Sequence, residues 1–454
     1  MMKKLAFVLL ISVILFSCNK ENDDDDNDHN PPPVDTTTFT IPATADLVMY
    51  EVNLRALSAT GDIPGVTGRL DEIKALGINV IWLMPIHPIG TINSVNSPYS
   101  VKNYKEVNPE FGTLNDFKTL VKEAHKKKMA VIIDWVANHT AWDNPWIVNK
   151  DWYTQDGSGN IISPPGTDWA DVADLDYTSQ AMRLAMIDAM EYWVKTADID
   201  GFRCDAADMV PVDFWIRAID SVDGSTAKEL IWLAEGGSNN LFSAGFQMNY
   251  AWNYYSKLKE VFQNNHSANT LITVHESEYA GLAEGKQKLR FTTNHDESAW
   301  DATPMVLFGG EAGALAASVA AIFPGGVPLI YGSQEVGVTQ NVPFFTNQPV
   351  NWSLHPEMLQ AYRDILGFYN QSAAIREGEM ESFSTSDILV FTKTLDQETV
   401  LIIDNLRNRT INYDIPAELE NYTWKDAITD TVFILTDITE LEAYQYIMLK
   451  AIVP

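Results

Sequence analysis

The sequence predicts an α/β fold: a closed (β/α)8 TIM barrel with a short insertion after the third strand and an all-β domain at the C-terminus. Three observations predict it. Eight apolar, strand-like runs alternate with segments of helical periodicity from about residue 47, one connection is unusually long, and the pattern changes to short alternating runs after residue 372. Alternation of strands and helices is typical of βα units with a parallel sheet, and eight such units close into a barrel.

Each barrel element is expected from its own run of residues. The strands are expected at 48–54, 79–84, 130–135, 199–205, 230–235, 246–250, 289–294 and 327–331. Amphipathic helices are expected between them, at 69–76, 114–128, 180–196, 212–222, 312–322 and 357–368.

The connection after the third strand holds Pro, Gly, Asn and aromatic residues with little periodicity. We therefore expect the barrel at 46–140 and 178–372, with a short inserted domain at 141–177. Residues 373–454 are expected to form a β-sandwich domain, with strands at 388–392, 399–403, 431–435 and 444–449.

The N-terminus is typical of an exported protein. Lys3 and Lys4 precede an apolar run at 5–16, which is too short to span a bilayer, so residues 1–17 are predicted to be a signal peptide. The run ends before Cys18 in a pattern that resembles a bacterial lipobox, which implies acylation of Cys18. We expect an exported lipoprotein, held by this lipid at the outer membrane, the cell surface or the periplasmic face. The acidic, proline-broken stretch 18–45 is predicted to be a solvated tether.

Charge and cysteine content exclude several classes of function. The 31 basic and 61 acidic residues give a net charge of −30, which repels phosphate backbones and argues against nucleic acid as a partner. The two cysteines, Cys18 and Cys204, cannot form a disulfide framework or a zinc cluster. Strand alternation turns the Cys204 thiol away from the expected site, so we interpret it as packing.

Polar residues gather where the expected strands end, which is where a barrel places its active site. The third strand ends in Asp134 and continues to Asn138 and His139. The fourth ends in Arg203 and Asp205, the fifth in Glu235, and the seventh is followed by Asn294, His295 and Asp296.

These side chains suit the cleavage of a glycosidic bond, which needs two carboxyl groups in different protonation states and stabilisation of a positively charged sugar ring. Arg203 and Asp205 are two residues apart on one strand, so they share a face, and the cation is expected to keep Asp205 ionised as a nucleophile. Glu235 follows an apolar strand and is expected to have a raised pKa, as an acid requires. Asp296 would stay anionic beside the sugar cation.

From about residue 48 to the end, the chain resembles the alpha-amylase family of glycoside hydrolases. The resemblance rests on ordered motifs: 134–139, 201–205, Glu235, 294–296, the segment 172–176 in the insertion, and 328–331 with Gln334 and Glu335. It implies a retaining enzyme that cleaves α-1,4-glucosidic bonds in starch-like glucans or maltooligosaccharides, with Asp205 as nucleophile, Glu235 as acid and Asp296 as the third carboxylate.

The resemblance also implies substrate-binding residues. Tyr99 would stack beneath the reacting sugar, His139 and His295 would donate to it, and Arg203 would orient Asp205 with support from Asp134. His87, which follows the second strand, is an additional candidate for the lining of the site, although a structural hydrogen bond explains it equally well. Aromatic residues of the insertion, Trp169 among them, are candidate sugar contacts.

Two departures from the family are visible. Asp208 and Met209 stand where many members have Lys and His, so a sugar contact on the leaving-group side is lost. No cofactor is needed for the chemistry. A structural calcium ion is implied through Asn138, but a full set of oxygen ligands cannot be assembled from the sequence.

Alternatives remain open at this stage. A transglycosylase of the same family would carry the same motifs, and endo and exo action are not separated. A non-catalytic glucan-binding surface lipoprotein would be expected to lose a carboxylate, and all three are present. A metal-dependent hydrolase using His87, His139 and His295 would need an HxH pair on the first strand, which has no His. The expected partner is an α-glucan, and the expected oligomeric state is a monomer.

Overall fold

The computed structural model describes residues 39–452. The predicted signal peptide, Cys18 and the tether up to residue 38 lie outside the described residues and remain predictions. Phe39 and Ile41, which were assigned to the tether, pack against the apolar cluster of the barrel interior, and the Phe39 ring stacks on His125 at 4.4 Å. The packed chain therefore begins before the expected boundary at 45, because these two side chains find an apolar surface to cover. Within 39–452, no helix has the length and apolarity needed to cross a bilayer.

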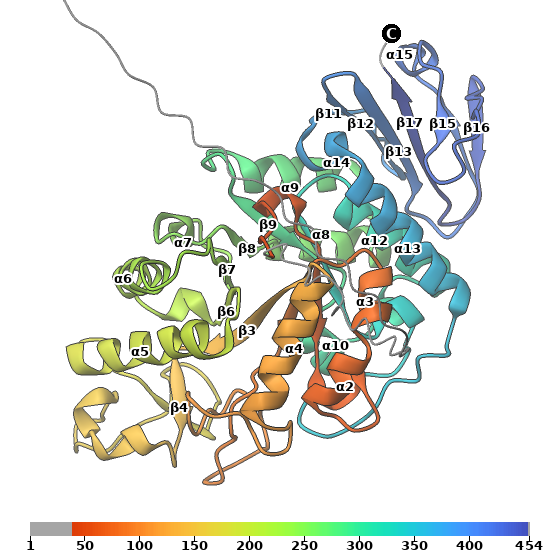
Figure 1. Ribbon diagram of the computed structural model, residues 1–454. Coiled ribbons are helices and arrows are strands. Elements are labelled where there is room, and N and C mark those ends of the chain that lie inside the picture. Colours follow the sequence, from red (N-terminus) through yellow and green to blue (C-terminus); the bar gives the residue numbers. More distant parts are fainter. Residues whose placement is uncertain (1–38, 453–454) are drawn as a thin grey trace, which may run out of the picture. The chain divides into compact units, whose positions relative to one another are not determined.

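Eight parallel strands close into a barrel, in the order β1-β10-β9-β8-β7-β6-β3-β2 (Figure 1). All eight expected strands are confirmed. Their bounds are β1 Met49–Val52, β2 Val80–Leu83, β3 Ala130–Val136, β6 Gly201–Asp205, β7 Ile231–Ala234, β8 Met248–Tyr250, β9 Gln287–Arg290 and β10 Val327–Tyr331.

Strand alternation divides the barrel into an apolar interior and a polar upper end. Met49, Ile132 and Leu233 belong to the buried cluster that fills the interior. Two residues further along the same strands, Glu51 and Asp134 point the same way and are also fully buried. The carboxyl ends of the strands therefore carry charged groups into one place, as a TIM barrel requires of its active site.

Helices surround the barrel, and the six expected helices are confirmed. They are α3 Leu70–Ala75, α4 Leu114–Lys126, α5 Gln180–Ala197, α6 Val212–Asp223, α12 Glu311–Ile322 and α13 Pro356–Gln371. Thr113 starts α4 with a capping box to Asp116. Two further long helices, α8 Trp252–Gln263 and α9 Asn269–Tyr279, were not expected. In α9, the β-branched run from Thr270 to Val274 disfavours a helix locally, and packing against α8 overrides that preference.

Short helices complete the barrel and its connections. They are α1 Leu54–Leu57, α2 Ile63–Gly68, α7 Asn240–Ser243, α10 His295–Trp300, α11 Pro304–Leu307 and α14 Ala373–Glu377. Of these, α10 matters most for the site, because Asn294 caps it through the Glu297 N–H and so fixes the direction of its first turn.

The long connection after β3 forms a small antiparallel ribbon of β4 (His139–Ala141) and β5 (Val172–Asp174). His139 lies opposite Asp174 in this ribbon. Short 3-10 turns fill the segment between the two strands, and the Tyr153 hydroxyl is buried against the Thr140 hydroxyl at 2.9 Å. The insertion is thereby tied to the end of the barrel strand that carries Asp134.

The C-terminal part is antiparallel throughout. A five-stranded sheet has the order β11-β12-β13-β17-β15, and a two-stranded ladder pairs β14 with β16. The bounds are β11 Glu379–Ser382, β12 Ile388–Leu395, β13 Glu398–Asn405, β14 Ile411–Asp414, β15 Lys425–Asp426, β16 Ile438–Leu441 and β17 Tyr446–Ile452, with α15 at Ala417–Glu420. Sheet and ladder share one buried core.

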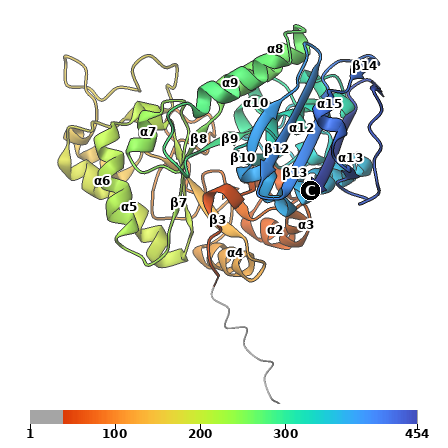
Figure 2. The same cartoon turned by 90° about the horizontal axis from the view of Figure 1, so that it is seen from above.

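One strand prediction in this region is wrong. Residues 431–435 form no strand; Val432 makes only a single bridge, to Lys425. Phe433 and Leu435 pack against the C-terminal core, and Val432 and Ile434 between them are exposed, so the side chains alternate as in a strand but the backbone pairs at one bridge only. Figure 2 shows β12 and β13 beside α12, where Val400 and Ile402 pack into the same cluster as the barrel helices.

Candidate active site

A cleft of about 790 Å³ opens at the carboxyl ends of the barrel strands. Strands β6 and β7, helix α10 and the insertion each contribute to its wall. Six of the predicted site residues line it: Tyr99, His139, Asp205, Glu235, His295 and Asp296. Asp296 is the most open of the three acids, with 41% of its side chain exposed.

Arg203 lies at the centre of the acidic groups and is fully buried. Its Nη1 donates to Asp134 Oδ1 and to Asp205 Oδ1, each at 2.9 Å. Its Nη2 lies 2.9 Å from Glu235 Oε1, an ion pair without the alignment of a hydrogen bond. The expected pairing with Asp205 is confirmed, and the same guanidinium also reaches the second acid, which the sequence did not predict.

Burial sets the protonation of the two acids. It raises the pKa of Glu235 to about 7, against the attraction of Arg203 and with the help of the nearby Asp205 charge. It raises the pKa of Asp205 to about 6, again against Arg203. Arg203 therefore limits the rise that burial causes in the pKa of Asp205, in line with the expectation that this cation keeps Asp205 ionised. The order of the two values still leaves Asp205 the more readily ionised group and Glu235 the better proton donor.

A buried network fixes His295. Its Nδ1 contacts the Glu51 carboxylate, and its Nε2 lies 2.8 Å from the Tyr99 hydroxyl. That hydroxyl donates to Asp134 Oδ2 at 3.0 Å. Burial alone would lower the pKa of His295, but the carboxylates of Asp296 and Glu51 outweigh it and raise the pKa to about 9. His295 is therefore a cation at neutral pH, and its charge faces the cleft beside Asp296.

His139 has the opposite character. Burial lowers its pKa to about 4, so its imidazole is neutral at pH 7. Its Nδ1 lies 3.3 Å from the Asn138 amide nitrogen, and its ring packs against Trp169 with the two planes 63° apart. The cleft thus holds one cationic and one neutral imidazole, and both nitrogens of the cationic one are already engaged, by Glu51 and by the Tyr99 hydroxyl.

Comparison with known proteins decides the family. Residues 21–164 and 166–398 match the family described as Alpha amylase, catalytic domain. The chain belongs to the alpha-amylase family. It is a glycosidase, as the resemblance of its motifs implied.

The relatives cover most of the chain. A crystal structure of an alpha-amylase from Lactobacillus plantarum superimposes with a TM-score of 0.80 at 27% identity, covering 90% of this chain and 99% of that one. Alpha-amylase 3 from Dictyoglomus thermophilum is 24% identical over 440 residues, which is 81% of this chain and 86% of the relative. An oligo-1,6-glucosidase from Halalkalibacterium halodurans is 29% identical over 282 residues, 53% of this chain and 47% of the relative. Relatives of similar sequence identity therefore bear the names of different glycosidase activities.

One predicted substrate contact of this alpha-amylase family protein is wrong. His87 does not line the cleft; it is fully buried among Tyr104, Trp135 and Trp193. Its Nδ1 lies 3.2 Å from the Glu106 carbonyl, and burial lowers its pKa to about 4. Because these aromatic rings enclose the His87 imidazole on several sides, it lies in the buried core and not in the cleft. Its role is the structural one that the sequence left open.

The departure at Asp208 has a local explanation. Asp208 Oδ2 accepts from the backbone N–H groups of Gly237 and Ser238, at 2.9 and 3.3 Å. A side chain on Gly236 would collide with the same carboxylate. Asp208 therefore holds the segment that follows Glu235, while Asp208 and Met209 both line the cleft. The position contributes a carboxylate to this wall instead of a cation.

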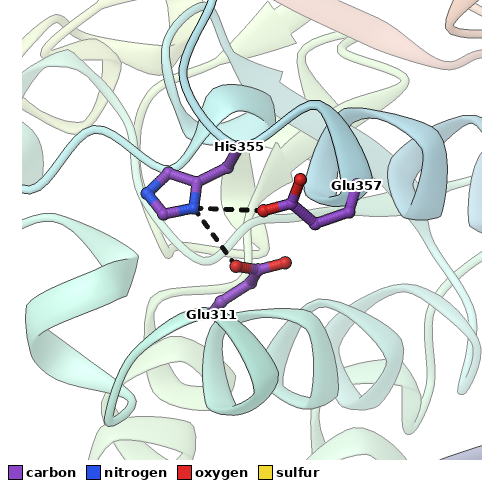
Figure 3. A group of neighbouring side chains, drawn as sticks. All are labelled: Glu311, His355 and Glu357. Carbon is purple, nitrogen blue, oxygen red and sulfur yellow. Dashed lines mark hydrogen bonds and ion pairs between the residues drawn. The ribbon is translucent and has the colours of Figure 1, made fainter.

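A calcium ion held through Asn138, which the resemblance implied, stays a prediction. Within 39–452, the one group of three His, Cys, Asp or Glu side chains with mutually close ligand atoms is Glu311, His355 and Glu357, drawn in Figure 3. The side-chain amide of Asn138 faces His139, and the backbone carbonyl of Asn138 accepts from the Leu175 N–H. No step proposed below depends on a metal.

The group in Figure 3 is explained without an ion. His355 Nδ1 lies 3.2 Å from Glu311 and 3.5 Å from Glu357. Both carboxylates lie in the first turns of their helices, α12 and α13, whose positive ends favour carboxylates and disfavour a cation.

Several residues in the cleft or buried behind it escaped the sequence reasoning. Glu51 could have been identified from the sequence. It follows Met49 by two residues on the first strand, so it faces the barrel interior and lies nearer the carboxyl end of that strand. The cleft itself is lined by four further aromatic residues, of which only Trp252 closely follows an expected strand: Trp252, Trp300, Phe344 and Phe345.

Proposed function

We propose that this protein hydrolyses α-1,4-glucosidic bonds in starch-like glucans or maltooligosaccharides, with retention of the anomeric configuration. The observation that carries the proposal is the shared contact of one buried guanidinium, Arg203, with the two carboxyl groups of Asp205 and Glu235. The arrangement keeps the more acidic group ionised and the less acidic one available as a proton donor.

In the first step, an Asp205 oxygen attacks the anomeric carbon, and the bond from that carbon to the leaving oxygen breaks. Glu235 gives its proton to the leaving oxygen, so the departing sugar is neutral. In the second step, Glu235 takes a proton from water, whose oxygen attacks the anomeric carbon and releases Asp205. Two inversions give net retention. The Ala206 N–H, which donates to Glu235 Oε2 at 2.7 Å, holds the acid in place.

The remaining groups act on the sugar ring that receives the attack. Asp296 is an exposed carboxylate that favours the positive charge of the transition state. His295 supplies a positive charge beside Asp296 while Glu51 and Tyr99 hold its two nitrogens, and His139 supplies a neutral donor. Tyr99 lies with its ring against His295, 18° from parallel, and offers its other side as a surface for the sugar.

The proposal is tested by product chromatography with starch, pullulan, maltooligosaccharides, isomaltose and trehalose. We expect maltooligosaccharides from starch, and proton NMR of the first product is expected to detect the α-anomer. Asp205→Asn and Glu235→Gln should each abolish most turnover, while Asp188→Asn, on the exposed face of α5 and far from the cleft residues, should not. Absence of cleavage on every α-glucoside would refute the proposal, and cleavage of α-1,6 bonds alone would reassign the linkage. Elongated products would make the protein a transglycosylase.

We also propose that the protein is exported and lipidated at Cys18. The support is the charged start, the apolar run 5–16 and the lipobox-like end. Labelling with a radioactive fatty acid should mark the wild type and leave Cys18→Ala unlabelled. Equal labelling of both would refute this proposal.

A further inference from the structure

The end of helix α10 carries an exposed tryptophan at the rim of the cleft. Trp300 is 65% exposed, and it lines the same cleft as Asp296. The two residues are four apart on α10, so their side chains leave the same face of the helix. Because this indole is exposed to water beside the cleft, a ligand that covered it would bury apolar surface, which favours binding.

Aromatic rings connect Trp300 to the catalytic centre. The Tyr99 ring lies 6.0 Å from that of Phe344, and Phe344 lies 5.8 Å from Trp300. Phe345 packs against both Phe344, at 4.9 Å, and Trp300, at 5.5 Å. A continuous aromatic strip, made of Tyr99, Phe344, Phe345 and Trp300, therefore runs from the reacting sugar's position to the rim.

The strip is fixed by hydrogen bonds to its backbone. Arg55 Nη1 donates to the Phe344 carbonyl at 2.9 Å, and Asn96 Nδ2 donates to the Phe345 carbonyl at 2.6 Å. Asn341 Nδ2 donates to the Ala299 carbonyl at 2.9 Å and so ties the loop to α10. A platform held in this way loses little conformational entropy when a ligand covers it.

We propose that Trp300 is a stacking platform for a glucose unit of the bound α-glucan, outside the unit that Asp205 attacks. This inference rests on the proposed function. The apolar face of a glucose ring suits the face of an indole. The strip begins at Tyr99, whose ring stacks on His295 at the proposed position of the reacting sugar, whereas Asp208 holds the segment that follows Glu235. The platform therefore serves the part of the chain that keeps the attacked anomeric carbon, and it makes the enzyme select longer oligosaccharides.

Kinetics with maltotriose and maltoheptaose test the platform. Trp300→Ala should lower kcat/KM for maltoheptaose by about two- to tenfold, the range of one aromatic stacking contact. The value for maltotriose should change by less than about twofold, because a short chain reacts without reaching the rim. Trp300→Phe should recover most of the loss. Val306→Ala, at a 59% exposed position outside the cleft lining, is the matched control and should change neither value.

Binding gives a second readout that needs no turnover. In a Glu235→Gln background, calorimetry should find weaker binding of maltoheptaose when Trp300→Ala is added, by the same factor. If alanine lowers the melting temperature, Trp300→Gln replaces it. An equal loss on both sugars, or no loss on either, would overturn the platform. A wild type inactive on both sugars would refute the proposed function instead.

Discussion

The carboxylate of Glu51 contacts Nδ1 of His295, and both side chains are buried. A residue of the first barrel strand thereby fixes the imidazole that begins α10, 244 positions further along the chain. Glu51 Oε2 has no hydrogen-bond partner among residues 39–452. The pair keeps a positive charge at a site where burial alone would remove it.

Glu51→Gln should weaken catalysis and move its pH dependence. The native pKa of His295 is about 9, so the imidazolium is present below that pH and lost as pH rises through it. Glu235 sets the alkaline limb of kcat/KM near pH 7, and removing the Glu51 charge lowers the pKa of His295 toward that value. Two protons are then lost in the same range, so the alkaline limb becomes steeper and moves to lower pH. We expect a fall of about 10- to 100-fold at pH 7, the range of a lost charge-assisted hydrogen bond. Glu284→Gln, at an exposed position, is the control. An unchanged pH profile would contradict the assigned role.

The wild-type pH profile should be bell-shaped with its maximum near the two acid pKa values. Glu235 must be protonated, so activity falls as pH rises above about 7. Asp205 must be ionised, so activity falls as pH drops below about 6. The measured limits belong to the interacting pair rather than to either residue alone. The test is kcat/KM against pH, and a maximum above pH 8 would be inconsistent with burial as the dominant influence on Glu235.

Arg203→Lys should lose both stability and activity. Arg203 pairs with Asp134, Asp205 and Glu235 from one planar guanidinium, and a lysine ammonium cannot reproduce that fork. Breaking a buried ion pair costs about 3–5 kcal/mol, which should appear in urea unfolding. Arg217→Lys, which keeps an exposed charge on α6, should unfold as the wild type does. Equal unfolding midpoints for the two variants would mean that one ammonium satisfies the three carboxylates as well as the planar guanidinium does.

The strand-end rule explains how much of the site was predictable. It places Asp134, Arg203, Asp205 and Glu235 at one end of the barrel because parallel strands share a direction. It applies equally to Glu51, which was missed only because the first strand ends without a familiar motif. His87 was misplaced for the converse reason: it also follows a strand, but neighbouring rings of the outer shell decide which way it points.

The rest depends on long-range packing. Trp300, Phe344 and Phe345 meet through loops whose course depends on Arg55 and Asn96, far away in sequence. Helix α9 and the segment 431–435 have the same explanation. A segment of high β-propensity forms a strand only where a neighbouring strand or surface can pair with it. The type of an element was therefore predictable where its hydrophobic periodicity extended over many residues. The course of the loops was not predictable.

Asp404 gives a final prediction, about stability. It lies on β13, two residues after Ile402 on the face that packs against the barrel helices, and it is fully buried. Neither of its carboxyl oxygens has a hydrogen-bond partner within the described chain, and burial raises its pKa well above the usual range. The native state therefore keeps a proton that the unfolded state releases. Above the ordinary Asp pKa of about 4, the free energy of unfolding falls as pH rises, by about 1.4 kcal/mol per pH unit while the native group stays protonated.

Asp404→Asn removes this titration, so its melting temperature should exceed that of the wild type at pH 8, and the gain should shrink toward pH 4. Asp396→Asn is the matched control, because Asp396 is exposed in the turn between β12 and β13 and asparagine tolerates its φ of 54°. Thermal unfolding of the three proteins from pH 4 to pH 8 measures the effect. A gain of equal size at every pH would mean that Asp404 is ionised in the folded protein, and the barrel face of β13 would then have to supply a compensating positive charge.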